Sequence, residues 1–244
     1  MRVAIHSLPR CGTKALQINF QSYLKTLPVM PVGANHPHGA GEPFNITSEE
    51  FSTGVTTNRI QTYDANGPVF AEGDPTPIYR ELGTRFVKLI RDKRNWVFKR
   101  TNLLWADPLL YDTITNVDKC IAVIRQDTFE HCLSFCLAYQ LQIWAEGEEL
   151  NKAKETFSKN KIRIDPVDFV RHYNSFIDYK NIKWTNHFQV VDFKDLIQIN
   201  SSEEFCNFFN LSLKPFEFKH FNIEYGDDKF NMVSNLNELK DAIK

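Results

Sequence analysis

Residues 8–14 (LPRCGTK) bring cationic side chains, a glycine and a hydroxyl together in one short loop. A short apolar run at residues 2–7 precedes the loop, and from Thr13 onwards apolar residues recur at every fourth position, which is typical of a helix. Backbone N–H groups at the start of such a helix have no acceptor inside it and suit an anionic group. Arg10 and Lys14 would add positive charge at the same place. The loop is therefore a candidate anion site.

This loop differs from the phosphate loop of the nucleoside triphosphatases. It is shorter than the GxxxxGK[ST] pattern, and no clear acidic Mg²⁺ site follows a second apolar strand. Enzymes that use nucleoside triphosphates depend on that metal to neutralise the polyphosphate. The sequence of this loop therefore predicts a site that binds an anion without a metal. His36 and His38 suggest a metal pair, but no third ligand stands beside them, and we assign no metal site.

A second group of polar residues follows the apolar run at residues 119–124 (KCIAVI), which is typical of a buried strand. Arg125 stands directly after this strand, and a helix is predicted to begin at Asp127. Ser134 follows seven residues later, which is about two helical turns and returns to the same face. An arginine at a strand end and a hydroxyl on the next helix can bind one phosphate group together.

The rest of the chain alternates between strand and helix patterns, which predicts an α/β fold with a central, mostly parallel sheet between two helical layers. Asp165 before Pro166 is a typical helix start, and Ser201 with Glu204 forms a capping box. Residues 145–161 are polar and predicted to be exposed. The predicted strands are 96–99, 119–124 and 187–191, and the predicted helices are 78–92, 105–114, 127–144, 165–180, 201–209 and 235–243.

The chain is expected to form one domain over residues 1–244, with two less regular parts. Residues 28–77 are rich in Pro, Gly, Asn and His, and we expect them to contact the acceptor substrate because loops on a rigid scaffold carry function. Asn66-Gly67 indicates a hairpin between Ile60 and Phe70. Residues 211–244 form a C-terminal tail that ends in a short helix.

Composition excludes several classes of protein. Lys+Arg 29 against Asp+Glu 30 gives a net charge of −1, and 42% of the residues are hydrophobic. A general binder of nucleic acid polymers needs a positive excess, and a disordered chain has fewer apolar residues. Five cysteines without a CxxC pair favour reduced thiols. No signal peptide or membrane-spanning run is recognisable, so we expect a cytoplasmic protein without a membrane partner.

The two motifs together resemble those of the sulfotransferases that use 3′-phosphoadenosine-5′-phosphosulfate (PAPS). Residues 7–16 (SLPRCGTKAL) are similar to the phosphosulfate loop of that family, usually PRSGTT or PKSGTT. Cys11 replaces the commoner Ser, and Lys14 replaces the usual second Thr or Ser. Residues 124–144 resemble the family's 3′-phosphate motif. The resemblance implies a P-loop-like sulfotransferase fold.

Within the second motif, the spacing is similar to that of the small bacterial trehalose-type sulfotransferases. Many family members place the serine eight residues after the arginine, whereas here Ser134 follows Arg125 by nine, with an Asp two residues after the arginine. Residues 39–46 (GAGEPFNI) resemble a Gly-x-x-Glu-Phe-Phe segment of the trehalose-type enzymes. Residues 190–197 (VVDFKDLI) are similar to a late strand and turn of the family.

The resemblance implies a role for each matched residue. Arg10 would also stabilise the charge on the leaving oxygen, with Lys14 assisting. Glu42 is implied as the general base that an acceptor hydroxyl needs, with His6, His36 and His38 as rivals. The 5′-phosphosulfate would be bound by Arg10, Cys11, Gly12, Thr13 and Lys14, and the 3′-phosphate by Arg125 and Ser134.

Three functions remain open at this point. The first is transfer of a sulfuryl group from PAPS to a hydroxyl of a carbohydrate or other small alcohol, although lipid-linked sugars and protein tyrosine are also possible acceptors. The second is a Mg²⁺-dependent P-loop nucleotide kinase or NTPase, which the missing lysine spacing disfavours. The third is a non-catalytic nucleotide-binding module of the same fold. Tight binding of adenosine 3′,5′-bisphosphate without Mg²⁺ separates the first from the second.

Overall fold

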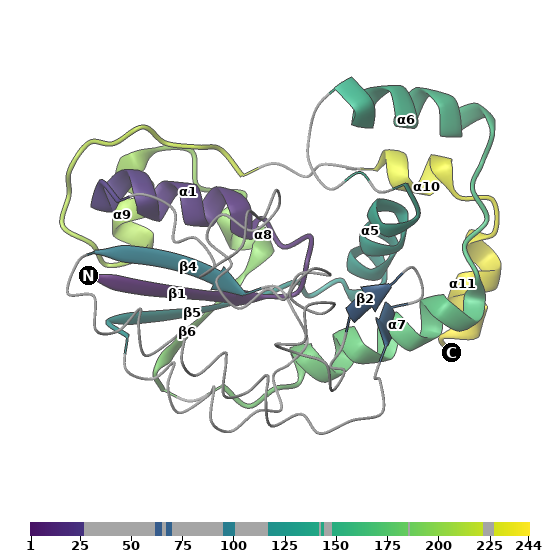
Figure 1. Cartoon of the computed structure of the whole chain (residues 1–244), viewed down its shortest axis with the longest axis horizontal. Coiled ribbons are helices and arrows are strands. Elements are labelled where there is room, and N and C mark those ends of the chain that lie inside the picture. Colours follow the sequence, from purple (N-terminus) through teal and green to yellow (C-terminus); the bar gives the residue numbers. More distant parts are fainter. Residues whose placement is uncertain are drawn as a thin grey trace, which may run out of the picture. The chain divides into compact units, whose positions relative to one another are not determined.

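The computed structural model describes residues 1–26, 62–64, 67–69, 95–100, 117–141, 143, 148–184, 186–221 and 227–244. Its contacts divide the chain into two compact units (Figure 1). The first comprises Met1–Asp64, Pro68–Ile124 and Lys183–Phe221, and the second comprises Ala65–Gly67, Arg125–Ile182 and Asn222–Lys244. That the whole chain forms one domain stays a prediction.

A four-stranded sheet is the centre of the first unit. Its strand order is β4-β1-β5-β6, and every neighbouring pair is parallel. The α/β class and the parallel sheet predicted from the sequence are thereby confirmed. The strands are β1 (Arg2–Ser7), β4 (Trp96–Arg100), β5 (Lys119–Ile124) and β6 (Phe188–Asp192).

One face of this sheet packs against three helices, α1 (Thr13–Leu24), α8 (Phe193–Leu196) and α9 (Ser202–Phe208) (Figure 1). Phe20 of α1 lies at the centre of their contact, with its ring 5.0 Å from the rings of both Phe205 and Phe209. The predicted cap of α9 is confirmed, because Glu204 N–H donates to Ser201 Oγ at 3.1 Å.

The opposite face of the sheet is buried as well, with Ala4, His6, Ala122 and Phe188. The helices predicted at 78–92 and 105–114 lie outside the described residues. At residues 62–69 a small two-stranded sheet pairs β2 (Thr62–Asp64) with β3 (Gly67–Val69), as expected for the predicted hairpin.

Helix α1 is also fixed by a segment far away in the sequence. The Asn19 side chain donates through Nδ2 to the Lys219 carbonyl at 2.8 Å and accepts from the Lys219 N–H at 2.7 Å. Tyr23 Oη donates to the Ser212 carbonyl at 3.2 Å. Residues 211–221 therefore pack along α1 through polar as well as apolar contacts. The sequence pattern did not indicate this role for the tail.

The second unit is helical. It contains α5 (Thr128–Leu141), α6 (Glu148–Lys159), α7 (Pro166–Lys180), α10 (Asp228–Met232) and α11 (Leu236–Ala242). Helices α5 and α7 pack through aromatic rings, with Phe135 5.4 Å and His131 4.5 Å from Phe176. The predicted start of α7 is confirmed, because the Asp165 carboxylate accepts from the Val167 N–H at 2.8 Å and Pro166 follows it.

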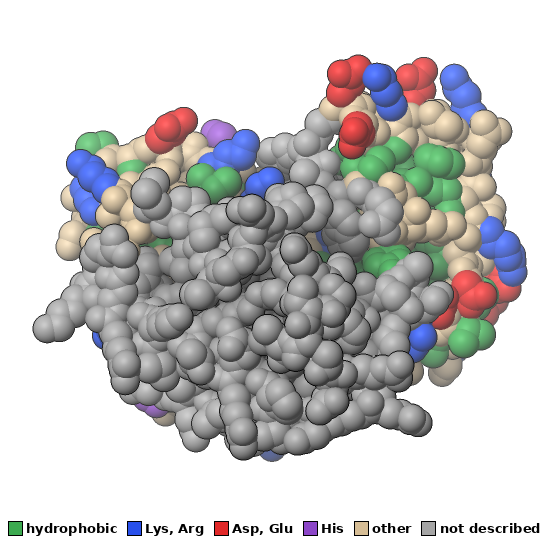
Figure 2. All heavy atoms as spheres, in the orientation of Figure 1, with side chains coloured by type: hydrophobic (Ala, Val, Ile, Leu, Met, Phe, Trp, Pro, Cys, Tyr) green, Lys and Arg blue, Asp and Glu red, His purple; other side chains and the backbone are tan. Residues whose placement is uncertain are grey.

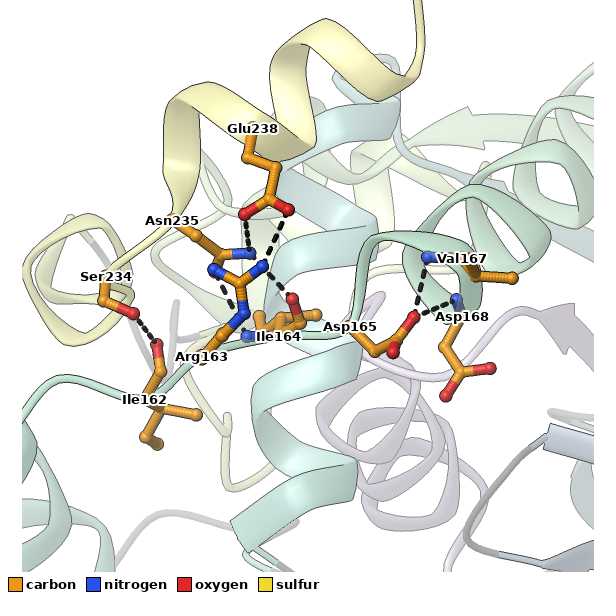
Figure 3. A network of polar contacts seen from close by, with 9 residues as sticks. All are labelled: Ile162, Arg163, Ile164, Asp165, Val167, Asp168, Ser234, Asn235 and Glu238. Carbon is orange, nitrogen blue, oxygen red and sulfur yellow. Dashed lines mark hydrogen bonds and ion pairs between the residues drawn. The ribbon is translucent and has the colours of Figure 1, made fainter.

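Residues 233–238 are joined to the segment before α7 by the polar network in Figure 3. The side chain of Asn235 accepts from the Ile164 N–H at 3.2 Å and donates to the Ile164 carbonyl at 2.8 Å. Arg163 pairs with Glu238 at 2.7 Å, and Ser234 Oγ donates to the Ile162 carbonyl at 3.1 Å. These contacts hold α11, which was predicted, beside α7.

Helix α6 was not predicted, although residues 145–161 were expected to be exposed. Only Leu150 and Ala153 of this helix are buried, so no wide apolar stripe indicates it in the sequence. Charged pairs at helical spacing contribute instead, with Glu148–Lys152 at 2.6 Å and Glu155–Lys159 at 4.0 Å. Figure 2 shows acidic and basic side chains along the outer edge of α6, at the top of the view.

Acid is expected to destabilise the chain through His172 of α7. Burial, with a smaller contribution from Arg171, lowers the pKa of His172 to about 4, while Asp168 opposes this shift. The unfolded chain therefore takes up a proton near pH 6.5 that the folded chain takes up only near pH 4. This stability is complete above pH 6.5, and about 3 kcal/mol should be lost as the pH falls to 4.

Denaturant titrations of the wild type and His172→Phe between pH 4 and pH 7 measure this dependence. The phenylalanine variant keeps a ring against Phe135 and should lose part of the slope. The exposed His187 provides the control, since His187→Gln should leave the slope unchanged. Equal slopes in the wild type and His172→Phe would show that His172 does not titrate in this way.

Candidate functional site

The loop between β1 and α1 has the backbone shape of an anion-binding turn. Arg10 and Gly12 both have left-handed backbone angles, with φ of 71° and 66°, and Gly12 is the N-cap of α1. The first helical hydrogen bond runs from Leu16 N–H to the Gly12 carbonyl at 3.2 Å. The N–H groups before Leu16 thus have no acceptor within the helix. The first turn of α1, which is fully described, carries no acidic side chain, so its positive end is not neutralised locally.

Side chains of the loop differ in what they can offer to an anion. Lys14 is exposed and Arg10 is half-buried, so both cations are near the surface of the first unit. Thr13 is buried, and its hydroxyl accepts from Ser7 Oγ at 3.4 Å. Cys11 is fully buried in the apolar core. The thiol of Cys11 therefore faces the core, and we expect any contact of this residue with the anion to be made by its backbone N–H.

Gly12 is required by packing as well as by backbone angle. A β-carbon at this position would lie 2.7 Å from Cε2 and 3.2 Å from Cδ2 of Phe193, and 3.6 Å from Cδ1 of Phe221. The first two distances are shorter than ordinary van der Waals contact. The rings of Phe193 and Phe221 thus support the loop from the core side and fix its position.

Replacing Gly12 with Ala should therefore destabilise the protein by about 2–4 kcal/mol, because it adds a strained left-handed alanine to a clash with Phe193. The melting temperature measures the effect. Lys25, at the other end of α1, has φ of 51°, so it offers a matched control. Lys25→Gly should leave the melting temperature unchanged or raise it, since glycine adopts this angle without strain. A Gly12→Ala protein as stable as the wild type would contradict the described loop.

A buried cluster of charges follows strand β5, within the second unit. Arg125 Nη2 lies 3.4 Å from Oε2 of Glu130, and Lys229 Nζ lies 3.2 Å from the same oxygen. The side chains of Arg125 and Lys229 are only 8% and 2% exposed, whereas Glu130 is 33% exposed. We call Arg125, Glu130 and Lys229 the charge cluster.

The residues of the charge cluster come from the first and the last parts of the sequence that forms the second unit. Arg125 follows β5, Glu130 lies in the first turn of α5, and Lys229 lies in α10. The ammonium of Lys229 also lies 4.5 Å from the centre of the Phe230 ring, which favours a cation there. Ser134 is buried one helical turn after Glu130, so the two share a face of α5.

This cluster has the chemistry of a phosphate site. Buried cations require anionic partners, and a bound phosphate can serve as one of them. Arginine presents a planar fork of N–H donors that matches two phosphate oxygens, and lysine adds a compact charge. Arg125 and Ser134 were predicted from the sequence, whereas Lys229 was missed. Its sequence context, Asp227-Asp228-Lys229, is typical of an exposed turn.

The remaining predicted site residues cannot all be compared with the structure. Glu42, His36 and His38 lie outside the described residues. His6 of β1 is fully buried, with its ring 5.3 Å from that of Phe188. Since a general base must reach the acceptor, burial in the sheet makes His6 a weaker candidate than Glu42.

Two further observations concern metals and membranes. Among the residues that the structure describes, no group of three or more His, Cys, Asp or Glu side chains is placed to hold a metal ion. Within the same described residues, no helix is both long and apolar enough to span a bilayer. All five cysteines are described, and each is buried and takes part in no disulfide.

Comparison with known proteins gives one structural neighbour. The sequence matches no family model and no curated protein. Among solved structures, the chain is similar to the "Sulfotransferase Domain from the Curacin Biosynthetic Pathway", at 12% sequence identity and a TM-score of 0.42, over 98% of this chain and 85% of that chain. At that level of similarity, we infer function from the chain's own residues.

Proposed function

We propose that this protein is a sulfotransferase that moves a sulfuryl group from PAPS to a hydroxyl of a small acceptor, such as a carbohydrate. Support comes from the agreement between the sequence motifs and the local geometry of each. The observation that carries the proposal is the burial of Arg125 with Lys229 around Glu130, because such a cluster suits a phosphate group. The loop at residues 8–12 adds a second feature suited to an anion.

Each feature fits a different part of the donor. The charge cluster, with the Ser134 hydroxyl, would hold the 3′-phosphate, which distinguishes PAPS from ADP and ATP. The loop would hold the 5′-phosphosulfate through backbone N–H groups, the Thr13 hydroxyl and the charges of Arg10 and Lys14. When bound, the donor supplies an activated sulfuryl group.

The chain's own contribution to the reaction is positioning and charge. Arg10 and Lys14 would stabilise the negative charge that develops on the leaving oxygen. Gly12 keeps the backbone close to the anion, since Phe193 and Phe221 support it from behind. Glu42, in a segment rich in Gly and Pro, would accept the proton of the acceptor hydroxyl.

Calorimetric titration with adenosine 3′,5′-bisphosphate in the presence of EDTA tests the proposal. We expect a dissociation constant in the micromolar range or lower, which corresponds to roughly −8 kcal/mol. ADP should bind much more weakly, because it lacks the 3′-phosphate. Equal binding of the two nucleotides, or binding that requires Mg²⁺, would contradict the proposal and favour a P-loop kinase or NTPase. Binding without transfer to any of a panel of hydroxyl acceptors would favour a non-catalytic module.

A further inference from the structure

A cavity in the second unit lies among residues that the proposed reaction does not use. Its volume is about 350 Å³, near the lower end of the range for ligand pockets. Among the described residues, those that line it belong to α5, to residues 163–165 and to α7. The side chains with polar groups at the cavity are Tyr139, Gln140, Arg163, Asp165, Asp168 and His172.

His172 is the unusual member of this lining. Its side chain is 4% exposed, and its ring packs edge-on against Phe135 at 4.9 Å. Within the part of the chain that the structure describes, neither ring nitrogen of His172 has a hydrogen-bond partner. The ring nitrogens of His172 are not among the described atoms that are sealed off without a partner, so they can bond to a molecule inside the cavity.

Among the described residues, charged side chains at the cavity are held in ion pairs or hydrogen bonds, which limits the charge of a ligand. Arg163 is paired with Glu238 at 2.7 Å, and Asp168 is paired with Arg171 at 2.9 Å. Figure 3 shows the Asp165 carboxylate directed at the N-terminus of α7, where it accepts from the Val167 and Asp168 N–H groups. An anion would meet two aspartates, and a cation would meet Arg163. A neutral ligand is repelled neither by the aspartates nor by Arg163.

The cavity presents neutral hydrogen-bonding groups to a ligand. His172 is uncharged near neutral pH, since burial lowers its pKa to about 4, so its ring has one donor and one acceptor. The Gln140 amide donates only a long bond, 3.4 Å, to the Arg163 carbonyl, and its oxygen can accept another. Tyr139, which lines the cavity from α5, adds aromatic surface beside these groups.

We propose that this cavity binds a small, neutral, polyhydroxylated molecule the size of one sugar ring, with His172 and Gln140 as its hydrogen-bonding partners. Hydroxyl groups both donate and accept, which matches a neutral imidazole and an amide. The apolar C–H face of a sugar ring suits an aromatic wall. The proposal is independent of the proposed sulfotransferase activity.

Titration of the full chain with D-glucose and with myo-inositol tests this proposal, read by NMR of the histidine side chains. The His172 signals are identified by their loss in His172→Phe. We expect a saturable shift of these signals, with little change at the exposed His187 and His220. D-glucosamine and D-gluconate, the cationic and anionic analogues, should bind at least fivefold more weakly. No saturable shift, or tighter binding of a charged analogue, would overturn the proposal.

Variants separate direct contact from a general effect on folding. Gln140 is exposed on α5, so Gln140→Leu should fold normally and weaken glucose binding about tenfold, as expected for one lost hydrogen bond. Lys152→Ala on α6 should leave binding unchanged. Unaltered glucose affinity in Gln140→Leu would contradict the assigned contact. Both variants should keep the wild-type affinity for adenosine 3′,5′-bisphosphate, so failure of the proposed function would be seen separately.

Discussion

Replacing Arg125 with Ala is expected to weaken binding of adenosine 3′,5′-bisphosphate by roughly 10- to 150-fold. The loss corresponds to about 1.5–3 kcal/mol, the usual value of a hydrogen bond to a charged group. Arg125 is 8% exposed and shares Glu130 with Lys229, so its fork of donors is already held in place in the folded chain. Calorimetry on the purified variant measures the change.

The matched control is Arg171→Ala, which removes an arginine from an exposed pair on α7 and should leave bisphosphate affinity within twofold. ADP binding provides a second comparison. If Arg125 contacts the 3′-phosphate, the variant should bind both nucleotides with nearly equal affinity. An Arg125→Ala protein that keeps the preference for the 3′-phosphate would show that this arginine is only structural.

Another variant of the charge cluster is predicted to raise the affinity for adenosine 3′,5′-bisphosphate, whereas Arg125→Ala lowers it. Glu130→Gln removes the negative charge that Arg125 and Lys229 share. The unliganded protein should be destabilised by about 1–3 kcal/mol. Bisphosphate affinity should rise, because the phosphate then replaces the missing charge. Thermal melting with and without the nucleotide measures both effects, and a fall in affinity would mean that Glu130 organises the site rather than competing for it.

Glu42→Gln should produce the largest loss of activity. A glutamine cannot accept the proton of the acceptor hydroxyl, and general-base catalysis contributes roughly 10²- to 10⁴-fold. Transfer of labelled sulfate from PAPS to the best acceptor of a panel measures the rate. Affinity for adenosine 3′,5′-bisphosphate should stay within twofold of wild type, since Glu42 has no proposed contact with the nucleotide.

Glu49 offers the control for this experiment, because it is another acidic residue of the Pro-, Gly- and Asn-rich segment at residues 28–77. Glu49→Gln should transfer sulfate at the wild-type rate. If Glu42→Gln does so too, the base lies elsewhere, and His36→Gln and His38→Gln become the next variants to measure. Comparing pH–rate profiles of the three would show which group loses its proton in the active enzyme.

The sequence predicts well those parts of the fold that are determined by residues close together in the chain. The strand at residues 2–7, the loop after it and α1 follow from apolar spacing and one glycine. The cap at Asp165 and the cap at Ser201 depend on side chains within three residues of the helix start. Each of these signals can be recognised without knowledge of distant contacts.

The parts that the sequence does not predict depend on distant neighbours. Lys229 belongs to the charge cluster only because α10 brings it to Glu130, which nothing in the pattern around residue 229 indicates. The cavity beside His172 needs the positions of α5, α7 and residues 163–165 together. Helix α6 buries too few apolar side chains for its period to be recognised.

The contact between α1 and residues 211–221 has a consequence for synthesis on the ribosome. Asn19 and Lys219 are 200 residues apart. At a synthesis rate of 5–20 residues per second, roughly 10–40 s pass between the addition of Asn19 and the addition of Lys219. During that interval the apolar side of α1 lacks Phe205 and Phe209, and Gly12 lacks the support of Phe221. We expect chaperones to bind the nascent N-terminal segment, and the loop to acquire its final shape only after residue 221 has left the exit tunnel.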